Sequence, residues 1–190
     1  MNLGRFNCAD GIIKILYTRG DLIVRTSTIN DWIFIDHLQK QNTHAIGFFP
    51  RSAFEKGFWS GLQNSVLLIC EKNADPVGYL SFTSGHGFMS YARIQQMVVR
   101  NDARRLDYGS ALIAVSKDFC NTFNRRGFTL RCRIDLDSNA FWKALGFVQY
   151  GIAEKGSINH TGMIASNDIN LYKLDCNDVT LSIPLFDERI

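Results

Sequence analysis

The chain has 190 residues, 46% of them hydrophobic and 12% aromatic, which fits one globular domain and excludes a disordered or repetitive protein. Its formal net charge of +3 suits binding of an anionic small molecule and is too small to indicate a nucleic-acid partner. Five scattered cysteines without a CxxC pair, and no apolar run of about 18 residues, predict a cytoplasmic protein without a disulfide framework, metal site or membrane span.

The first half of the chain is predicted to alternate short strands and helices. Residues 1–20 are expected to form an N-terminal extension that pairs with the core or with another subunit, which leaves a homodimer open. The elements expected next are a strand over 21–27, a helix over 32–40, an aromatic loop over 44–51, a short helix over 52–58, and hairpin strands over 66–70 and 76–82.

The second half continues as strand, helix, strand and helix. The elements expected are a strand over 94–100, an amphipathic helix ending at Gly127, a strand over 128–133, a short helix over 138–145, a polar loop reaching Gly162, and a strand near 169–172. Without repeats or linkers, residues 21–174 form one domain, with a tail over 175–190 packed on it. This order predicts an α/β protein with a mixed sheet covered by helices.

The stretch from Ile94 to Gly127 has the pattern of an anion site. A strand is followed by a short basic turn and a helix start near Gly109 and Ser110. Unpaired backbone N–H groups and the positive end of the helix dipole point the same way at such a turn. The turn also carries arginines, whose guanidinium groups suit a phosphate.

This stretch resembles the GNAT acetyltransferase superfamily. That family carries Arg/Gln-x-x-Gly-x-Gly/Ala after its fourth strand, where backbone amides hold the pyrophosphate of acetyl-CoA. The matching residues here are Arg104-Arg105-Leu106-Asp107-Tyr108-Gly109, with the usual valine five residues earlier as Val99. Asp107 replaces one core glycine. We expect it to point outward or to cap the helix that begins at Tyr108, so that its backbone N–H still donates.

A second motif lies further along the chain. The run from Asn139 through Phe141 and Trp142 to Gly146 and Phe147 resembles the Asn-x-Phe-Tyr/Trp signature of the same family. In the family this helix lies beside the pantetheine arm and its asparagine contacts the cofactor. The two motifs occur in the family's order, and the resemblance spans about 22–173.

The resemblance implies a GNAT fold, a mixed and mostly antiparallel sheet flanked by helices and splayed between the fourth and fifth strands. It implies acetyl-CoA as cosubstrate, with pantetheine pairing along the fourth strand. The cofactor-binding residues it implies are Met97, Val98, Val99, Arg104, Arg105, Leu106, Asp107, Tyr108, Gly109, Ser110, Asn139 and Trp142.

The residues for proton transfer depart from the family. Gln95 stands where many relatives carry a glutamate base, and Trp142 where many carry a tyrosine acid; neither titrates near neutrality. Gln95 is the candidate catalytic residue, able to orient a water relay. His86, Tyr91 and Tyr108 are alternatives, each more often a loop or packing residue.

The expected function is acetyl transfer from acetyl-CoA to an amine of a small molecule, peptide or protein by direct attack in a ternary complex. The alternative is a catalytically weak or inactive GNAT-fold module that binds CoA or a protein partner. A third reading, acetylation of an RNA-linked amine, would use the arginines at 125, 126, 131 and 133, which surface solvation explains more simply.

Overall fold

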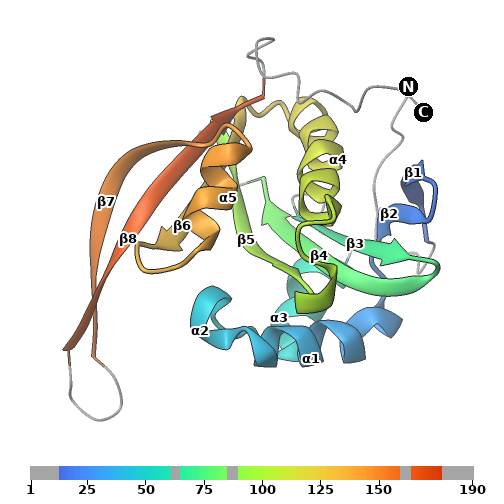
Figure 1. Ribbon diagram of the computed structural model, residues 1–190, viewed down its shortest axis with the longest axis horizontal. Coiled ribbons are helices and arrows are strands. Elements are labelled where there is room, and N and C mark those ends of the chain that lie inside the picture. Colours follow the sequence, from blue (N-terminus) through green and yellow to red (C-terminus); the bar gives the residue numbers. More distant parts are fainter. Residues whose placement is uncertain (1–12, 61–64, 85–89, 159–163, 177–190) are drawn as a thin grey trace.

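The protein is a single curved sheet with helices on both faces (Figure 1). The computed structural model describes residues 13–60, 65–84, 90–158 and 164–176. The strands are β1 (Ile15–Arg19), β2 (Leu22–Thr26), β3 (Ser65–Lys72), β4 (Asp75–Thr83), β5 (Tyr91–Val99), β6 (Gly127–Arg133), β7 (Val148–Ile158) and β8 (Ile164–Asp175). The helical elements are η2 (Ile29–Asp31), α1 (Trp32–Gln41), α2 (Thr43–Ile46), α3 (Arg51–Phe54), η3 (Glu55–Trp59), η4 (Asn101–Ala103), α4 (Tyr108–Thr122) and α5 (Ser138–Ala144).

The sheet is mixed and mostly antiparallel, which confirms the predicted fold class. Its strand order is β1-β2-β3-β4-β5-β6-β8-β7, and β5 with β6 is the parallel pair in the described sheet. That ladder ends at the pair Arg93–Thr129, although both strands continue. The sheet therefore forks between β5 and β6, the splay expected between the fourth and fifth strands.

The predicted fourth and fifth strands are β5 and β6 in the structure, because an additional strand, β1, pairs antiparallel with β2 at the sheet edge. This strand lies within residues 1–20, expected as an extension. Residues 1–12 and 177–190, which hold the rest of that segment and most of the predicted tail, lie outside the described residues.

Each face of the sheet has its own core. Helices α4 and α5 cover one face, and α1, α2 and α3 lie across the other (Figure 1). On the first face α4 buries residues such as Leu112 and Phe119 against strand residues such as Phe82 and Phe128. The second face packs Ile35 and other helix residues against the central strands. The forked strands are thus held in place by packing on both sides.

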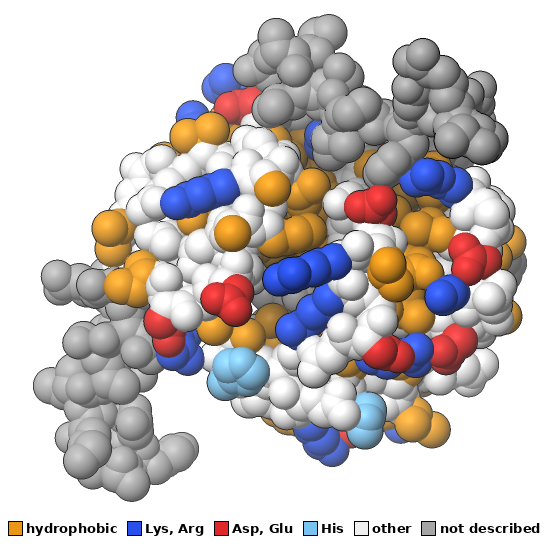
Figure 2. Space-filling model, viewed as in Figure 1, with side chains coloured by type: hydrophobic (Ala, Val, Ile, Leu, Met, Phe, Trp, Pro, Cys, Tyr) orange, Lys and Arg blue, Asp and Glu red, His pale blue; other side chains and the backbone are white. Residues whose placement is uncertain are grey.

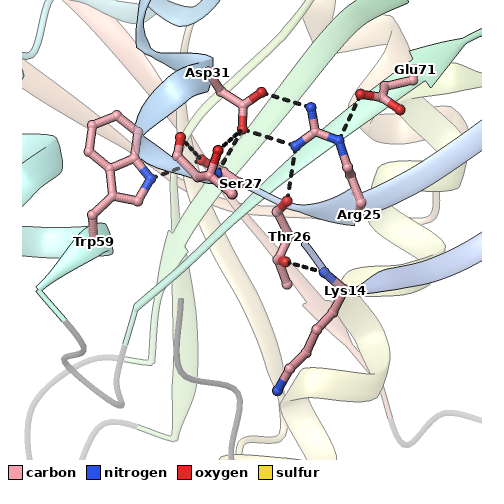
Figure 3. A network of polar contacts seen from close by, with 8 residues as sticks. Lys14, Arg25, Thr26, Ser27, Asp31, Trp59 and Glu71 are labelled. Carbon is pink, nitrogen blue, oxygen red and sulfur yellow. Dashed lines mark hydrogen bonds and ion pairs between the residues drawn. The ribbon is translucent and has the colours of Figure 1, made fainter. Parts of the chain in front are cut away.

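A buried ion network anchors the start of α1 to the sheet (Figure 3). Arg25 on β2 is 6% exposed; its two terminal nitrogens donate to Asp31 at 2.9 and 2.7 Å, and its Nε donates to Glu71 at 2.7 Å. Burial lowers the pKa of Arg25, but the hydrogen bonds and charges of Asp31 and Glu71 outweigh it and raise that pKa overall. Asp31 also accepts from the Thr28 N–H at 2.7 Å, which fixes the turn before α1.

The structure corrects the sequence prediction in three places. Helix α4 ends at Thr122, and Gly127 begins β6; a Cβ there would collide with the carbonyl oxygen of Leu174 on β8, so the glycine serves strand packing and not a helix end. The expected loop over 44–51 contains the helical turn α2. Part of the expected loop reaching Gly162 belongs instead to β7, which runs to Ile158 and pairs with β8 in a long ribbon (Figure 1).

Candidate functional site

The fork between β5 and β6 opens into a cleft of about 840 Å³. It is walled by β5, β6, the turn before α4, helix α5 and helix α2. Figure 2 shows a hollow on this face with hydrophobic side chains inside it and Lys and Arg side chains at its rim. An apolar interior with a positive rim suits a ligand that has a slender apolar arm and an anionic end.

One wall of the cleft is a strand edge that has no neighbouring strand. From Ile94 onward the edge of β5 that faces β6 makes no strand pairing in the described sheet. The opposite edge pairs with β4, and its register passes from Ser81–Gln96 to Phe82–Ile94, which leaves Gln95 as a bulge residue. Backbone groups of β5 thus remain available to hydrogen-bond an extended ligand.

The turn between β5 and α4 has the geometry of an anion site. Arg105 and Asp107 both have positive φ, 61° and 62°, on either side of Leu106. Such turns aim successive backbone N–H groups into one concavity, and here the first turn of α4, from Tyr108, adds its own N–H groups. Asp107 holds the left-handed conformation that glycine adopts most easily and that aspartate tolerates among other residues.

Of the two placements expected for the Asp107 side chain, the structure has the exposed one and not the helix cap. Asp107 is the residue before α4, but its side chain accepts no capping hydrogen bond. Its backbone carbonyl instead accepts the first helical hydrogen bond, from the Ala111 N–H at 2.9 Å. The side chain is exposed and lines the cleft, so its negative charge lies, with that of Asp137, among the arginines of the cleft lining.

Arg104 ties the turn to two neighbouring elements. Its Nε donates to the Val99 carbonyl oxygen at 3.2 Å, and its Nη2 donates to Asn42 Oδ1 at 3.0 Å. The guanidinium is therefore placed where β5 ends and α1 meets α2. Arg105, exposed at the cleft, has no hydrogen bond or ion pair to the described residues.

The opposite wall comes from α5 and β6. Trp142 is 7% exposed and packs its ring against Phe141 at 5.1 Å between centroids. Burial raises the pKa of the Cys132 thiol, whose Sγ lies 3.3 Å from Ser138 Oγ. Gly109 closes the floor, because a Cβ there would lie 2.9 Å from Met97 Cε and about 3.0 Å from Phe141.

Three residues of the expected cofactor set lie outside the cleft lining: Leu106, which is exposed, Tyr108 and Asn139. The Asn139 amide donates to the carbonyl oxygens of Arg133 and Leu136, each at 2.7 Å, and its Oδ1 accepts from Asn170 and Tyr172. Those contacts favour a role in holding the turn between β6 and α5. Tyr108 is buried in the core on the α4 face, and burial raises its pKa.

The candidate proton-transfer groups are dispersed. The Gln95 amide donates to Thr83 Oγ1 at 3.2 Å and lines the cleft. The Tyr91 hydroxyl donates to Asp175 at 2.5 Å, away from the cleft lining, and this hydrogen bond raises the pKa of Tyr91. His86 lies outside the described residues. His44, which α2 brings to the cleft, is not among the predicted site residues, because the sequence predicts a loop for this segment.

A second overlooked residue is Gln96, buried under the cleft. Its Oε1 accepts from the Tyr79 hydroxyl at 3.1 Å, and its Nε2 donates to the carbonyl oxygens of Ile46 and Gly47, each at 3.4 Å. Gln96 thereby fastens the end of α2 to β5. The bulge at Gln95 turns Gln96 to this face, and strand alternation alone would not have shown it.

No helix within the described ranges is both long and apolar enough to cross a membrane.

Comparison with known proteins agrees with this geometry. The family model of the acetyltransferase (GNAT) family matches residues 32–147. Among solved structures, RimL, a ribosomal alpha-N-protein acetyltransferase, superposes with a TM-score of 0.68 at 14% identity, covering 87% of this chain and 96% of its own. No curated protein sequence matches the chain.

Two further solved structures are similar. An acetyltransferase that modifies a ribosomal-protein alanine in Escherichia coli has a TM-score of 0.64 at 15% identity, covering 82% of this chain and 94% of its own. A putative acetyltransferase from Salmonella typhimurium, solved with acetyl-CoA, has a TM-score of 0.66 at 14% identity, covering 84% and 96%. At this identity the likeness concerns the fold.

Proposed function

Because the chain belongs to the acetyltransferase (GNAT) family, which uses acetyl-CoA, we propose that it transfers the acetyl group to a primary amine of a peptide or protein. The observation that carries the proposal is the fork: an unpaired strand edge runs from the cleft floor to a turn rich in free backbone N–H groups. An unpaired strand edge alone, or such a turn alone, is common in proteins; their position at the two ends of one cleft is what indicates a cosubstrate site.

The residues present fit the cosubstrate at each part of its length. Arg104, Arg105 and the first turn of α4 would hold the pyrophosphate by charge and by backbone N–H groups. The free edge of β5 from Met97 to Val99 would hydrogen-bond the amides of the pantetheine arm, and the ring of Trp142 would cover its apolar part. The arm would thus bring its thioester to the fork.

The chain's contribution to the reaction is then mainly one of position. Holding donor and amine in attack geometry can supply a large share of the barrier reduction. A backbone N–H at the β5 edge would donate to the thioester oxygen as negative charge grows there. Gln95 would orient a water toward the amine, and this water would pass the amine's proton to solvent.

A peptide or protein acceptor is supported by the structural neighbours and by the open fork. Two of the solved structures described above are named as enzymes that acetylate ribosomal proteins. In this chain the fork is open beyond α2, and the β7–β8 ribbon extends from it without a helix over its outer part (Figure 1). An extended segment could therefore reach the thioester with its terminal amine first.

The test is a thiol-release assay with acetyl-CoA and a panel of peptides that have free N-termini, run beside small amines. The proposal expects acetyl-CoA-dependent release with at least one peptide, and a mass increase of one acetyl group on its N-terminus. Acetylation of small amines alone would overturn the choice of acceptor. Thermal stabilisation by CoA without any turnover would instead favour the binding module.

The binding module remains the second candidate because of one observation. The residue at the expected base position is Gln95, and its amide is already engaged with Thr83. An amide cannot take a proton near neutrality. Replacement of Gln95 by Glu separates the two: a gain in turnover fits an enzyme that relies on solvent, and no turnover in either form fits the module.

A further inference from the structure

Two arginines on the acceptor side of the fork have no acidic partner among the described residues. Arg93 belongs to the last pair of the β5–β6 ladder, opposite Thr129. Arg131 follows Thr129 by two residues on β6 and lines the cleft. Because side chains two apart on a strand point to the same face, Arg93 and Arg131 share one face of the sheet. Both are exposed, and neither makes an ion pair or hydrogen bond to a described residue.

That face is the one on which the acceptor would approach. The buried neighbours Ala92, Leu130 and Cys132 point into the core below α4 and α5, so the arginines point to the opposite side. Arg133 points the same way and donates to the His44 carbonyl oxygen of α2 at 2.9 Å. The arginine pair therefore lies beside the opening between α2 and the fork.

Arg93 and Arg131 place two positive charges close to each other. Arg93 is exposed but partly desolvated by its neighbours, and this desolvation, followed by the neighbouring charge of Arg131, lowers its pKa. The two guanidiniums therefore repel each other. Arg133, in contrast, has its charge balanced by an ion pair with Asp135. Two like charges left side by side at the mouth of a site are stabilised when a ligand supplies the opposite charge.

We propose that Arg93 and Arg131 recognise a carboxylate close to the amine of the acceptor, so that the preferred acceptor is a peptide with an acidic residue just after its N-terminus. This inference rests on the proposed function. Tyr150 on β7, 54% exposed, lies near enough to Arg93 to oppose the lowering of its pKa, and its ring offers such a peptide an aromatic surface close to the pair.

An acidic peptide explains the pair better than RNA does. RNA binding needs a continuous basic surface. Lys173, opposite Thr129 on β8, is paired with Asp175 at 3.9 Å. Arg126, the residue before β6, stacks over the Tyr91 ring, 5.8 Å from its centroid, and is five residues from Arg131 along the chain. The exposed carboxylates of Asp135 and Asp137 interrupt any basic surface that would continue from the pair toward α5.

The experiment compares three peptides that differ only at positions 2 and 3, which are both Asp, both Asn or both Lys. For the native protein we expect kcat/KM on the Asp peptide to exceed that on the Asn peptide by roughly 30-fold, since hydrogen bonds to charged groups are the strong ones. The double variant Arg93→Gln with Arg131→Gln should lose this preference and keep its rate on the Asn peptide within about threefold.

Three further variants make the result specific. Arg131→Lys should retain part of the preference, because it retains the charge. Arg131→Glu should shift the preference toward the Lys peptide. The matched control is Lys56→Gln, an exposed cation on η3 outside the cleft lining, which should change nothing.

Failure of the inference is distinguishable from failure of the proposed function. Equal rates on all three peptides, or equal loss on Asp and Asn peptides in the double variant, would overturn the role of the pair while leaving acetyl transfer intact. If no peptide is acetylated, calorimetric titration of the same peptides into the CoA-loaded protein tests whether the arginine pair binds the Asp peptide. Arginine-dependent binding of the Asp peptide upholds the inference, and its absence, or binding of RNA in its place, overturns it.

Discussion

Replacing Gly109 with alanine should damage cofactor binding without damaging the fold. A Cβ at this position would lie 2.9 Å from Met97 Cε and 3.0 Å from Phe141 Cζ, closer than ordinary van der Waals contact. The Met97 methyl is the end of a flexible side chain and can move at little cost, and the Phe141 ring needs to shift by only a few tenths of an ångström. Both side chains line the cleft, so the displaced atoms would occupy part of the volume that the pantetheine arm of CoA is proposed to fill.

The two effects on stability nearly cancel. Overpacking at the mild end costs about 1 kcal/mol. Alanine in place of glycine in a helix returns roughly 0.5–1 kcal/mol. We therefore expect the melting temperature of Gly109→Ala to stay within about 4 °C of the native protein. Loss of even one well-packed contact along the pantetheine arm should weaken CoA binding by about tenfold, or about 1.4 kcal/mol.

Isothermal titration of CoA, with thermal unfolding of the same samples, measures both quantities. Gly57→Ala on η3 is the matched control, since a Cβ there meets no atom within 4 Å. It should alter neither quantity. Native affinity in Gly109→Ala, at an unchanged melting temperature, would refute the placement of the ligand between Met97 and Phe141.

Four other changes test the account. Asp107→Gly removes a carboxylate from the rim and should tighten CoA binding by about threefold to tenfold in calorimetry, the effect shrinking as salt rises. Asn139→Ala, which leaves several polar groups unpaired, should lower the free energy of unfolding by about 3 kcal/mol in urea while CoA affinity stays within about threefold. Arg25→Ala strands the buried Asp31 carboxylate and should cost about 3–5 kcal/mol of stability. His44→Ala should slow turnover by less than about tenfold and leave the rate rising with pH through about 8, the pKa of an α-amine; loss of that rise would make His44 the base.

The sequence predicted the elements well where local pattern decides them. The hairpin of β3 and β4, helix α1 and the alternation of β6 follow from periodicity. The prediction for Gly127 was wrong, because a glycine is required there by the close approach of β8, a strand more than 30 residues later. A helix pattern that ends in a glycine cannot distinguish a helix end from a tight strand contact.

The part of the candidate site that depends on neighbouring residues in the sequence was predicted, and the part that depends on tertiary packing was not. The turn from Arg104 to Ser110 is a local motif, and its backbone geometry follows from neighbouring residues. The role of Asn139 depends on Asn170 and Tyr172, which tertiary packing brings to it. The pairing of Arg93 with Arg131 depends on strand register, which single-residue patterns do not contain.

The central claim is that the turn after β5 grips the pyrophosphate of coenzyme A. Calorimetric titration of CoA into the native protein and into the double variant Arg104→Ala with Arg105→Ala tests it most directly. The account predicts saturable binding by the native protein, and binding at least about 30-fold weaker in the variant, since charge-assisted contacts to phosphate are lost. No binding by the native protein, or equal affinity in both, would contradict it.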